Sequence, residues 1–132
     1  MPDSRKGISE YNLTAAGAAG QGIETFSVIL GKVFVRAGWH AFALQDKESR
    51  IRGGHNFFQM RISRRPVGCH ALPLDLLIAL TGESMELHRE ELGPSGIILY
   101  DSKKGSPRED EKHHAIGLAF EQIAQETGGS SV

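Results

Sequence analysis

Three glycines within six residues, Gly17, Gly20 and Gly22, form the stretch of this chain best suited to binding an anion. They follow an apolar run typical of a strand and precede an apolar-periodic run typical of a helix. Glycine lets the backbone turn sharply and approach a ligand closely, and a helix N-terminus presents N–H groups and the positive end of its dipole. We therefore predict that this loop, including Gln21, binds phosphate. The alternative is a tight turn that needs glycine only for packing.

The spacing of these glycines is G-x-x-G-x-G, a permutation of the G-x-G-x-x-G pattern that binds dinucleotides. In that pattern an acid about 20 residues further on holds the ribose, and Asp46 and Glu48 lie near this position. Nucleotide binding with Asp46 on a ribose therefore stays open as an alternative. Glu24, in the first turn of the expected helix, favours the helix dipole but opposes an approaching phosphate.

Arginines gather around a second pair of glycines, Gly53 and Gly54. Five of them fall within sixteen residues: Arg50, Arg52, Arg61, Arg64 and Arg65. Guanidinium suits phosphate because it forms bidentate, charge-assisted hydrogen bonds. For the two arginines in the turn at 64–65 we favour a solvated basic patch. Arg61 differs because it lies in the middle of an expected strand, where a buried guanidinium must be paired or bind a ligand.

Other kinds of chemistry find little support in the residues. The six histidines are scattered without the spacing of a zinc site, no G-x-S-x-G nucleophile motif is present, and no pair suggests an acid and a base. The single cysteine, Cys69, excludes an internal disulfide and an all-cysteine iron–sulfur cluster held by this chain alone. We therefore expect no catalytic residue and no metal site here.

Charge and hydropathy point to a soluble protein. The net charge of −1 gives no general attraction to nucleic acid or membrane. The first residues lack the apolar core of a signal peptide, and no apolar run approaches the ~20 residues that cross a bilayer. We expect a cytoplasmic protein that binds neither nucleic acid nor membrane.

The elements that must position these residues alternate along the chain. We expect one domain over residues 1–132 with loose ends at about 1–7 and 128–132. Strands are predicted at 8–16, 39–45, 55–63, 74–80 and 97–100, helices at 23–36, 84–88 and 114–127, and turns at 64–68 and 93–96. The order predicts an α/β fold, a three-layer sandwich with a mostly parallel mixed sheet flanked by helices. The strand at 55–63 follows too short a connection for a parallel crossover, so we expect it to run antiparallel.

Four stretches in this order carry a family resemblance: residues 17–22 opening a helix, 49–55 (Ser-Arg-Ile-Arg-Gly-Gly-His), 60–63 (Met-Arg-Ile-Ser) and 75–80 (Asp-Leu-Leu-Ile-Ala-Leu). Together they resemble the gamma domain of 2-oxoacid:ferredoxin oxidoreductases. His55 and the Leu-His-Arg-Glu-Glu-Leu stretch at 87–92 look most like the 2-oxoglutarate type, in which this domain begins a fused alpha subunit. The resemblance covers about residues 12–100, with a looser match at 120–128.

The resemblance implies a part of an enzyme that oxidatively decarboxylates a 2-oxoacid, joins the acyl group to coenzyme A and reduces ferredoxin. Thiamine diphosphate and iron–sulfur clusters would lie in partner subunits or domains, since this chain lacks their motifs. The chain would serve as an assembly module and coenzyme A lid, inactive by itself. Its expected contacts with coenzyme A are Gly17, Gly20, Gln21, Gly22, Arg52, Gly53, Gly54 and Arg61. A ligand-free interaction module remains the other alternative.

Overall fold

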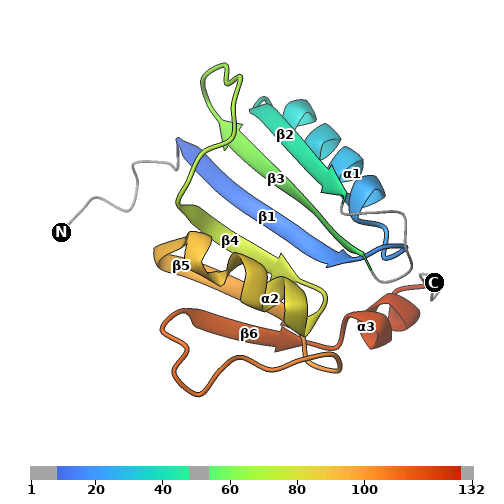
Figure 1. The fold of residues 1–132 in the computed structure, drawn as a ribbon. Helices are drawn as coiled ribbons and strands as arrows, with labels where there is room; N and C mark the ends of the chain where they lie inside the picture. Colours follow the sequence, from blue (N-terminus) through green and yellow to red (C-terminus); the bar gives the residue numbers. More distant parts are fainter. Residues whose placement is uncertain (1–8, 48–53, 129–132) are drawn as a thin grey trace.

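A six-stranded sheet forms the centre of the computed structural model, which describes residues 9–47 and 54–128 (Figure 1). Its strands lie in the order β2-β3-β1-β4-β5-β6. They are β1 (Glu10–Ala18), β2 (His40–Lys47), β3 (His55–Ser63), β4 (Leu74–Ala79), β5 (Leu92–Asp101) and β6 (His114–Leu118). The helices are α1 (Ile23–Arg36), α2 (Gly82–His88), the 3-10 turn η1 (Arg89–Glu91) and α3 (Phe120–Glu126).

The sheet is mixed and mostly parallel, as expected. Strands β1, β4, β5 and β6 pair in parallel, whereas β3 runs antiparallel to both β1 and β2. The antiparallel direction predicted for residues 55–63 is therefore confirmed, and so are the bounds of that strand and of the helix at 23–36. Of the expected loose ends at 1–7 and 128–132, every residue except Gly128 lies outside the described residues.

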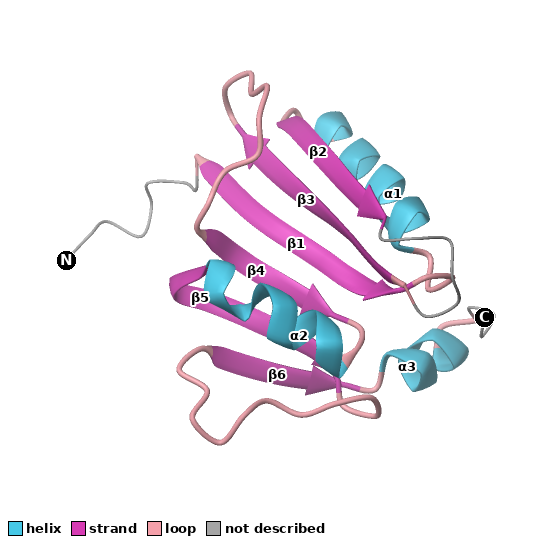
Figure 2. Cartoon of the chain, in the orientation of Figure 1, coloured by secondary structure: helices cyan, strands magenta, loops and turns pink. Residues whose placement is uncertain are grey.

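Helices α1 and α2 cover opposite faces of the sheet, which gives the expected three layers (Figure 2). Successive side chains of a strand point to opposite faces, and β4 shows the consequence. Leu76 and Ile78 pack in the cluster beneath α1, whereas Leu77 and Ala79 pack in the cluster beneath α2 with Met85. Residues 74–79 of the predicted 74–80 run thus form a strand that packs on both faces, as its composition predicted.

Local residues account for both ends of α1 and for the start of α2. On α1, the residues Phe26, Leu30 and Phe34 recur at helical spacing and pack onto the sheet. Gly38, with φ 88°, follows the end of this helix in the left-handed conformation that glycine tolerates best. On α2, the Thr81 hydroxyl accepts a hydrogen bond from the Ser84 N–H at 3.1 Å, so Thr81 is the N-cap.

The predicted helix at 114–127 is wrong over its first half, because residues 114–118 form β6 and only Phe120–Glu126 is helical. Gly117 explains the difference. It lies opposite Tyr100 on β5, and a Cβ atom at this position would come within 2.8 Å of the Tyr100 ring. Glycine also weakens a helix by about 1 kcal/mol relative to alanine. Ile116 fitted the apolar face of the predicted helix, but pairing with β5 decides the conformation.

The predicted turn at 93–96 is also wrong, because these residues lie within β5. They form an irregularity in the strand rather than a reversal of the chain. Leu74 pairs with Leu92 and Leu76 pairs with Ile97, so two steps along β4 match five steps along β5. Glycine and proline in a strand often mark such bulges, and the sequence alone does not distinguish a bulge from a turn.

Candidate functional site

The turn between β1 and α1 requires glycine at two positions. Gly20 and Gly22 adopt left-handed conformations, with φ of 89° and 78°, and Gly22 is the N-cap of α1. Gly17 is needed for space, since a Cβ atom there would lie 2.5 Å from Gln21 Oε1 and 3.2 Å from Leu80 Cβ. The three glycines are therefore explained by backbone geometry and packing before any ligand is considered.

Several amides of this loop already have partners inside the protein. The Ala18 N–H donates to Gln21 Oε1 at 2.6 Å, the Ala19 N–H donates to the Gly54 carbonyl at 2.8 Å, and the Gln21 N–H donates to the Ala18 carbonyl at 3.2 Å. The side-chain oxygen of Gln21 thus stabilises the loop from within. A ligand would have to use the amides that follow, at the start of α1.

A cavity of about 330 Å³ lies at the N-terminus of α1. Its walls come from the glycine loop, the first turn of α1, the end of β2 and the start of β3. The lining residues are Gly20, Gly22, Ile23, Glu24, Thr25, Gln45, Asp46, Asn56 and Phe57. Among the described residues no side chain caps this helix, and the first N–H groups of a helix lack acceptors within it. We call the glycine loop at residues 17–22, together with Gly54 and this cavity, the glycine corner.

Two carboxylates give the glycine corner an acidic wall. Glu24 stands in the first turn of α1, and Asp46 lies near the end of β2. These carboxylates repel a phosphate, but they accept hydrogen bonds from donors such as ribose hydroxyls. The structure thus brings Asp46 to Gly20 and Gly22, the arrangement that the nucleotide alternative requires. Glu48, the other acid considered for a ribose, lies outside the described residues.

The expected coenzyme A contacts are only partly brought together. Gly54 is held beside the loop because its carbonyl accepts the hydrogen bond from the Ala19 N–H. Arg52 and Gly53 lie outside the described residues. Arg61 is at the other end of β3, because it pairs with Asn12 whereas His55 pairs with Ala18. Six residues of strand separate Arg61 from His55, which corresponds to about 20 Å.

Arg61 has partners of its own near the start of β1. Its Nε donates to Glu10 Oε1 at 2.5 Å, and Nη1 lies 3.4 Å from Cys69 Sγ. The hydrogen bond from Arg61 lowers the pKa of Glu10 below its ordinary value and raises the pKa of Arg61. The requirement that a mid-strand arginine be paired is met by Glu10, and the structure does not bring Arg61 to the glycine corner.

A buried polar network on β3 and η1 was not predicted as a group. His55 Nε2 lies 2.8 Å from His88 Nε2, His88 Nδ1 lies 2.6 Å from Glu91 Oε1, and Gln59 Nε2 donates to Glu91 Oε2 at 2.8 Å. The sequence offered one signal. His55 and the stretch at 87–92 both carried the likeness to the 2-oxoglutarate type, and the structure brings them into contact.

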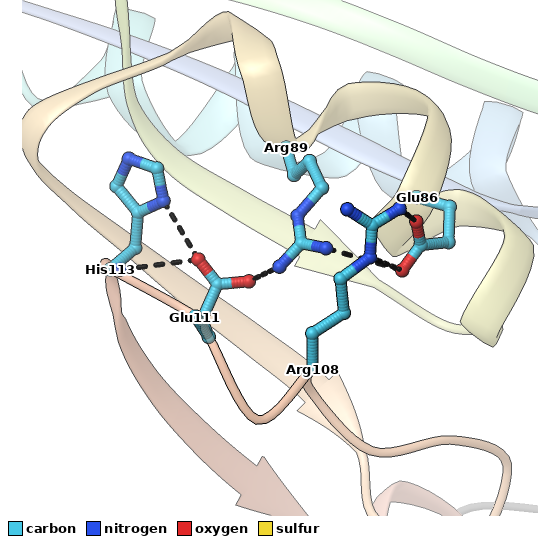
Figure 3. Close-up of polar contacts among 5 residues, drawn as sticks. All are labelled: Glu86, Arg89, Arg108, Glu111 and His113. Carbon is cyan, nitrogen blue, oxygen red and sulfur yellow. Dashed lines mark hydrogen bonds and ion pairs between the residues drawn. The ribbon is translucent and has the colours of Figure 1, made fainter.

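A second network fastens the loop before β6 onto α2 and η1 (Figure 3). Buried Arg89 forms ion pairs with Glu111 and with Glu86, the latter at 3.3 Å. Arg108 also pairs with Glu86, and His113 Nδ1 lies 2.9 Å from Glu111 Oε1. Each charge in this network faces an opposite charge or a hydrogen-bond partner, which indicates a structural role.

Metal ligands do not cluster in residues 9–47 and 54–128, where no group of three or more His, Cys, Asp or Glu side chains could hold an ion. Cys69 is exposed and free. A cluster held by four thiolates does not fit these residues. None of the helices in the described part of the chain has the length and apolar character needed to cross a membrane.

Comparison with known proteins supports the resemblance drawn from the four sequence stretches. The family model of pyruvate ferredoxin/flavodoxin oxidoreductases matches residues 12–132. Subunit alpha of 2-oxoacid:ferredoxin oxidoreductase 2 from Aeropyrum pernix is 31% identical over 101 residues, which cover 76% of this chain and 16% of that subunit. The chain therefore spans only a small part of the length of this relative.

Two solved structures share the fold. The 2-oxoglutarate:ferredoxin oxidoreductase from Magnetococcus marinus, with 2-oxoglutarate, coenzyme A and succinyl-CoA bound, superposes with a TM-score of 0.80 at 25% identity, over 92% of this chain and 22% of that one. The gamma subunit of a keto/oxoacid ferredoxin oxidoreductase from Geobacter sulfurreducens gives 0.73 at 25% identity, over 92% and 67%. The predicted α/β class is confirmed.

Proposed function

The chain belongs to the family of pyruvate ferredoxin/flavodoxin oxidoreductases, and on that premise we propose that it acts as the gamma domain of a 2-oxoacid:ferredoxin oxidoreductase. The A. pernix and G. sulfurreducens proteins are subunits of such enzymes. The M. marinus enzyme supports 2-oxoglutarate as the substrate and coenzyme A as the acyl acceptor. Thiamine diphosphate and iron–sulfur clusters supply decarboxylation and electron transfer from partner subunits or domains. We place the complex in the cytoplasm.

Within that complex the glycine corner binds the phosphates of coenzyme A, and the domain covers the coenzyme A entrance. The observation that carries this proposal is the cavity of about 330 Å³ at the start of α1, which no side chain of the described residues caps. A phosphate beside these first amides gains both their hydrogen bonds and the positive end of the helix dipole. Gly20 and Gly22 keep the approach to the amides clear of side chains.

The two carboxylates of the cavity determine how a nucleotide would lie there. Glu24 and Asp46 repel phosphate, so the phosphates occupy the side of the cavity next to the glycines. A ribose hydroxyl pointing toward Asp46 finds a strong acceptor instead. Coenzyme A carries both groups, because its pyrophosphate is joined to a phosphorylated adenosine.

The position of Asp46 also favours a second candidate function, a nucleotide-binding domain that works without the complex. Asp46 lines the same cavity as Gly20 and Gly22, and an acid in this place holds the ribose of a dinucleotide. Calorimetric titration of the chain with coenzyme A, NAD and ATP distinguishes the candidates. Binding of NAD without binding of coenzyme A supports the second candidate.

The coenzyme A proposal is tested by placing a charge in the cavity of the assembled enzyme. Thr25 is exposed at the cavity wall in the first turn of α1. Thr25→Asp suits the helix dipole, so the fold is retained, but the new carboxylate repels a phosphate. A repulsion of about 1 kcal/mol raises the Michaelis constant for coenzyme A roughly fivefold. The constant for the 2-oxoacid stays unchanged.

Gln125→Glu is the matched control, since it adds the same charge on the exposed surface of α3. It leaves both Michaelis constants unchanged. If Thr25→Asp behaves like this control, coenzyme A phosphate does not bind at the glycine corner. The family membership is unaffected by that result, and the chain is then an interaction module without a ligand at this corner.

A further inference from the structure

An apolar groove of about 490 Å³ runs between α1 and the edge strand β2, which lie side by side in Figure 1. Its lining includes Val28, Val35, Ala41, Ala43 and Met60. A second hollow of about 410 Å³ at the start of β2 shares Val35 and Ala41 with the groove. The α1 side of β2 is thus open over most of its length. Apolar surface left open in this way is typical of a site for another protein chain.

The outer side of β2 also offers unpaired backbone groups. Within residues 9–47 and 54–128, β2 ends the sheet and pairs only with β3, without a bulge. It has eight residues and contains no proline, one of the residues that protect a sheet edge. The opposite edge strand, β6, has five residues, and one of them is Gly117. Strand β2 is therefore the edge better suited to accept a further strand.

The position of α1 leaves room for a second copy of this chain at the β2 edge. Helix α1 packs equally on β2 and β3, so its axis is set back from the edge by half a strand spacing, or about 2.4 Å. If two copies join through β2 about a twofold axis perpendicular to the sheet, their α1 axes lie about 10 Å apart. Helices pack at separations of about 8–10 Å. Strand pairing and helix packing therefore occur together in such a dimer.

The row of α1 that lines the groove is suited to this contact. The start and end of α1 lie near the end and start of β2, respectively, so the middle of the helix, at Gly31, lies beside Ala43. A twofold axis at Ala43 places Val28 of one copy near Val35 of the other. These valines are 48% and 57% exposed. Gly31 lines the groove between them and adds no side chain that would keep the helices apart.

The sequence of β2 is complementary to itself in an antiparallel pair centred on Ala43. Opposite residues must face the same side of the sheet, so the twofold axis passes through a residue. With Ala43 opposite its own copy, the other pairs are Phe42 with Leu44, Ala41 with Gln45 and His40 with Asp46. Apolar side chains thus meet on the side away from α1, and alanine lies at the centre beneath the two helices. A histidine N–H donates to a carboxylate at each end of the pair.

Shifting this pair along the strand spoils the match. When the pair is centred on Leu44, Phe42 lies opposite the Asp46 carboxylate. When it is centred on Phe42, His40 lies opposite Leu44 and only residues 40–44 of the strand are paired. The register about Ala43 therefore combines the longest pairing with apolar and charged side chains opposite suitable partners.

We propose that β2 and α1 form the interface of a symmetric dimer of this chain, with Ala43 at the twofold axis. The two six-stranded sheets join into one continuous sheet, and the exposed valines of the groove are covered. Asp46 also lines the glycine corner. Its carboxylate has two oxygens, so contact with His40 leaves an acceptor for a ligand. The dimer goes beyond the enzyme assignment and does not depend on which ligand, if any, binds at the glycine corner.

Sedimentation equilibrium of the full chain at concentrations up to about 100 μM tests the dimer. The expected mass is about twice the 14.4 kDa of one chain. A mass of one chain over the whole range overturns the proposal, and the groove is then left for a different partner.

Val35→Glu tests whether the groove is the interface. It places a carboxylate against the apolar groove of the second copy, where an unpaired charge is costly, so the dissociation constant is expected to rise at least tenfold. Val33→Glu is the matched control, because Val33 is 56% exposed against 57% for Val35. It lies about 200° around the helix from Val35 and is not among the residues that line the groove.

The control is expected to keep the dissociation constant of the unmodified chain. Circular dichroism checks that both variants keep the fold. Equal dissociation constants for Val35→Glu and Val33→Glu overturn the proposal.

Disulfide trapping tests the register. The Cys69→Ser background removes the exposed native thiol, and Ala43→Cys then places two thiols opposite each other at the axis. The Cα atoms of opposite residues lie about 4.5–5.5 Å apart, within the range that a disulfide spans. Gln45→Cys is the control, since its two copies lie about 14 Å apart along the strands. Mild oxidation is expected to link Ala43→Cys chains and not Gln45→Cys chains. Equal linkage of the two variants, or no linkage of Ala43→Cys, overturns the proposal.

Discussion

The two faces of β3 have opposite chemistry. On the α1 side, Phe58, Met60 and Ile62 are almost completely buried in an apolar cluster. On the other side, His55, Gln59 and Arg61 each bond to a side chain far away in the sequence. The same nine residues therefore fasten the strand by packing on one face and by hydrogen bonds and ion pairs on the other.

The difference shows what each kind of contact specifies. Packing stabilises in proportion to the area buried and is tolerant of partner identity. Polar contacts give less net free energy, but a lost partner leaves a buried group unsatisfied. The apolar face therefore supplies most of the stability of β3. The polar face determines which loop and turn residues lie against it.

The largest expected effect comes from truncation on the apolar face. Phe58 is fully buried and meets the Phe26 ring edge-on at 5.6 Å. Phe58→Ala removes this contact and leaves a cavity, which destabilises the fold by about 3–5 kcal/mol. Phe57→Ala, one residue away on the polar face, is the matched control. Phe57 is only partly buried, so its truncation has a smaller effect in urea unfolding.

The comparison of the two faces fails if these neighbouring truncations are equally destabilising. That outcome would mean that the polar face is packed as tightly as the apolar one. Phe58→Leu separates the loss of volume from the loss of the aromatic ring. It keeps most of the packing and costs less than about 1.5 kcal/mol.

A smaller effect is expected from the polar network. Gln59→Leu keeps the size of the side chain but removes the hydrogen bond to Glu91. Hydrogen bonds to charged groups contribute about 1.5–3 kcal/mol, and partial exposure of Glu91 places the loss near the lower value. Gln45→Leu on the edge strand β2 is the control, since Gln45 is exposed. Equal urea midpoints for the two variants would show that the bond to Glu91 adds nothing.

The apolar face also explains how much of the fold was predictable. Alternation from residue 55 to 63 and helical spacing from 23 to 36 predicted both elements with their bounds, because burial of one face imposes those periods. Residues 114–118 and 93–96 were mispredicted, since their conformation depends on pairing with β5 and β4 rather than on local pattern. Such pairing joins residues that are not neighbours in the sequence.

The candidate site was predicted less completely, for a related reason. The glycine loop was predicted because a turn before a helix has a local signature, and Asp46 because the dinucleotide pattern places an acid about 20 residues further on. The contact between His55 and His88 joins residues 33 positions apart, and no spacing rule connects them. Arg61 was grouped with the glycines by residue type, and the direction of β3 places it at the other end. A chemical preference for phosphate does not place a side chain.

The smallest expected effect concerns Glu10 and Arg61, at the solvent end of the polar face. The hydrogen bond from Arg61 lowers the pKa of Glu10 below its ordinary 4.5. Stability from this bond is therefore fully present above pH 4.5 and is lost as the pH falls through the lower, folded-state pKa. The side chain of Arg61 is 22% exposed and that of Glu10 is 36% exposed, so water and salt weaken the pair. Glu10→Gln, which cannot ionise, lacks this acid-dependent loss.

Between pH 7 and pH 3.5, the midpoint of urea unfolding should fall further for the unmodified chain than for the variant. Added salt should reduce this difference between the two proteins. If the urea midpoint falls equally for both proteins, the charge of Glu10 contributes no stability through its pair with Arg61. The polar face would then add no charge-dependent stability at this end of β3.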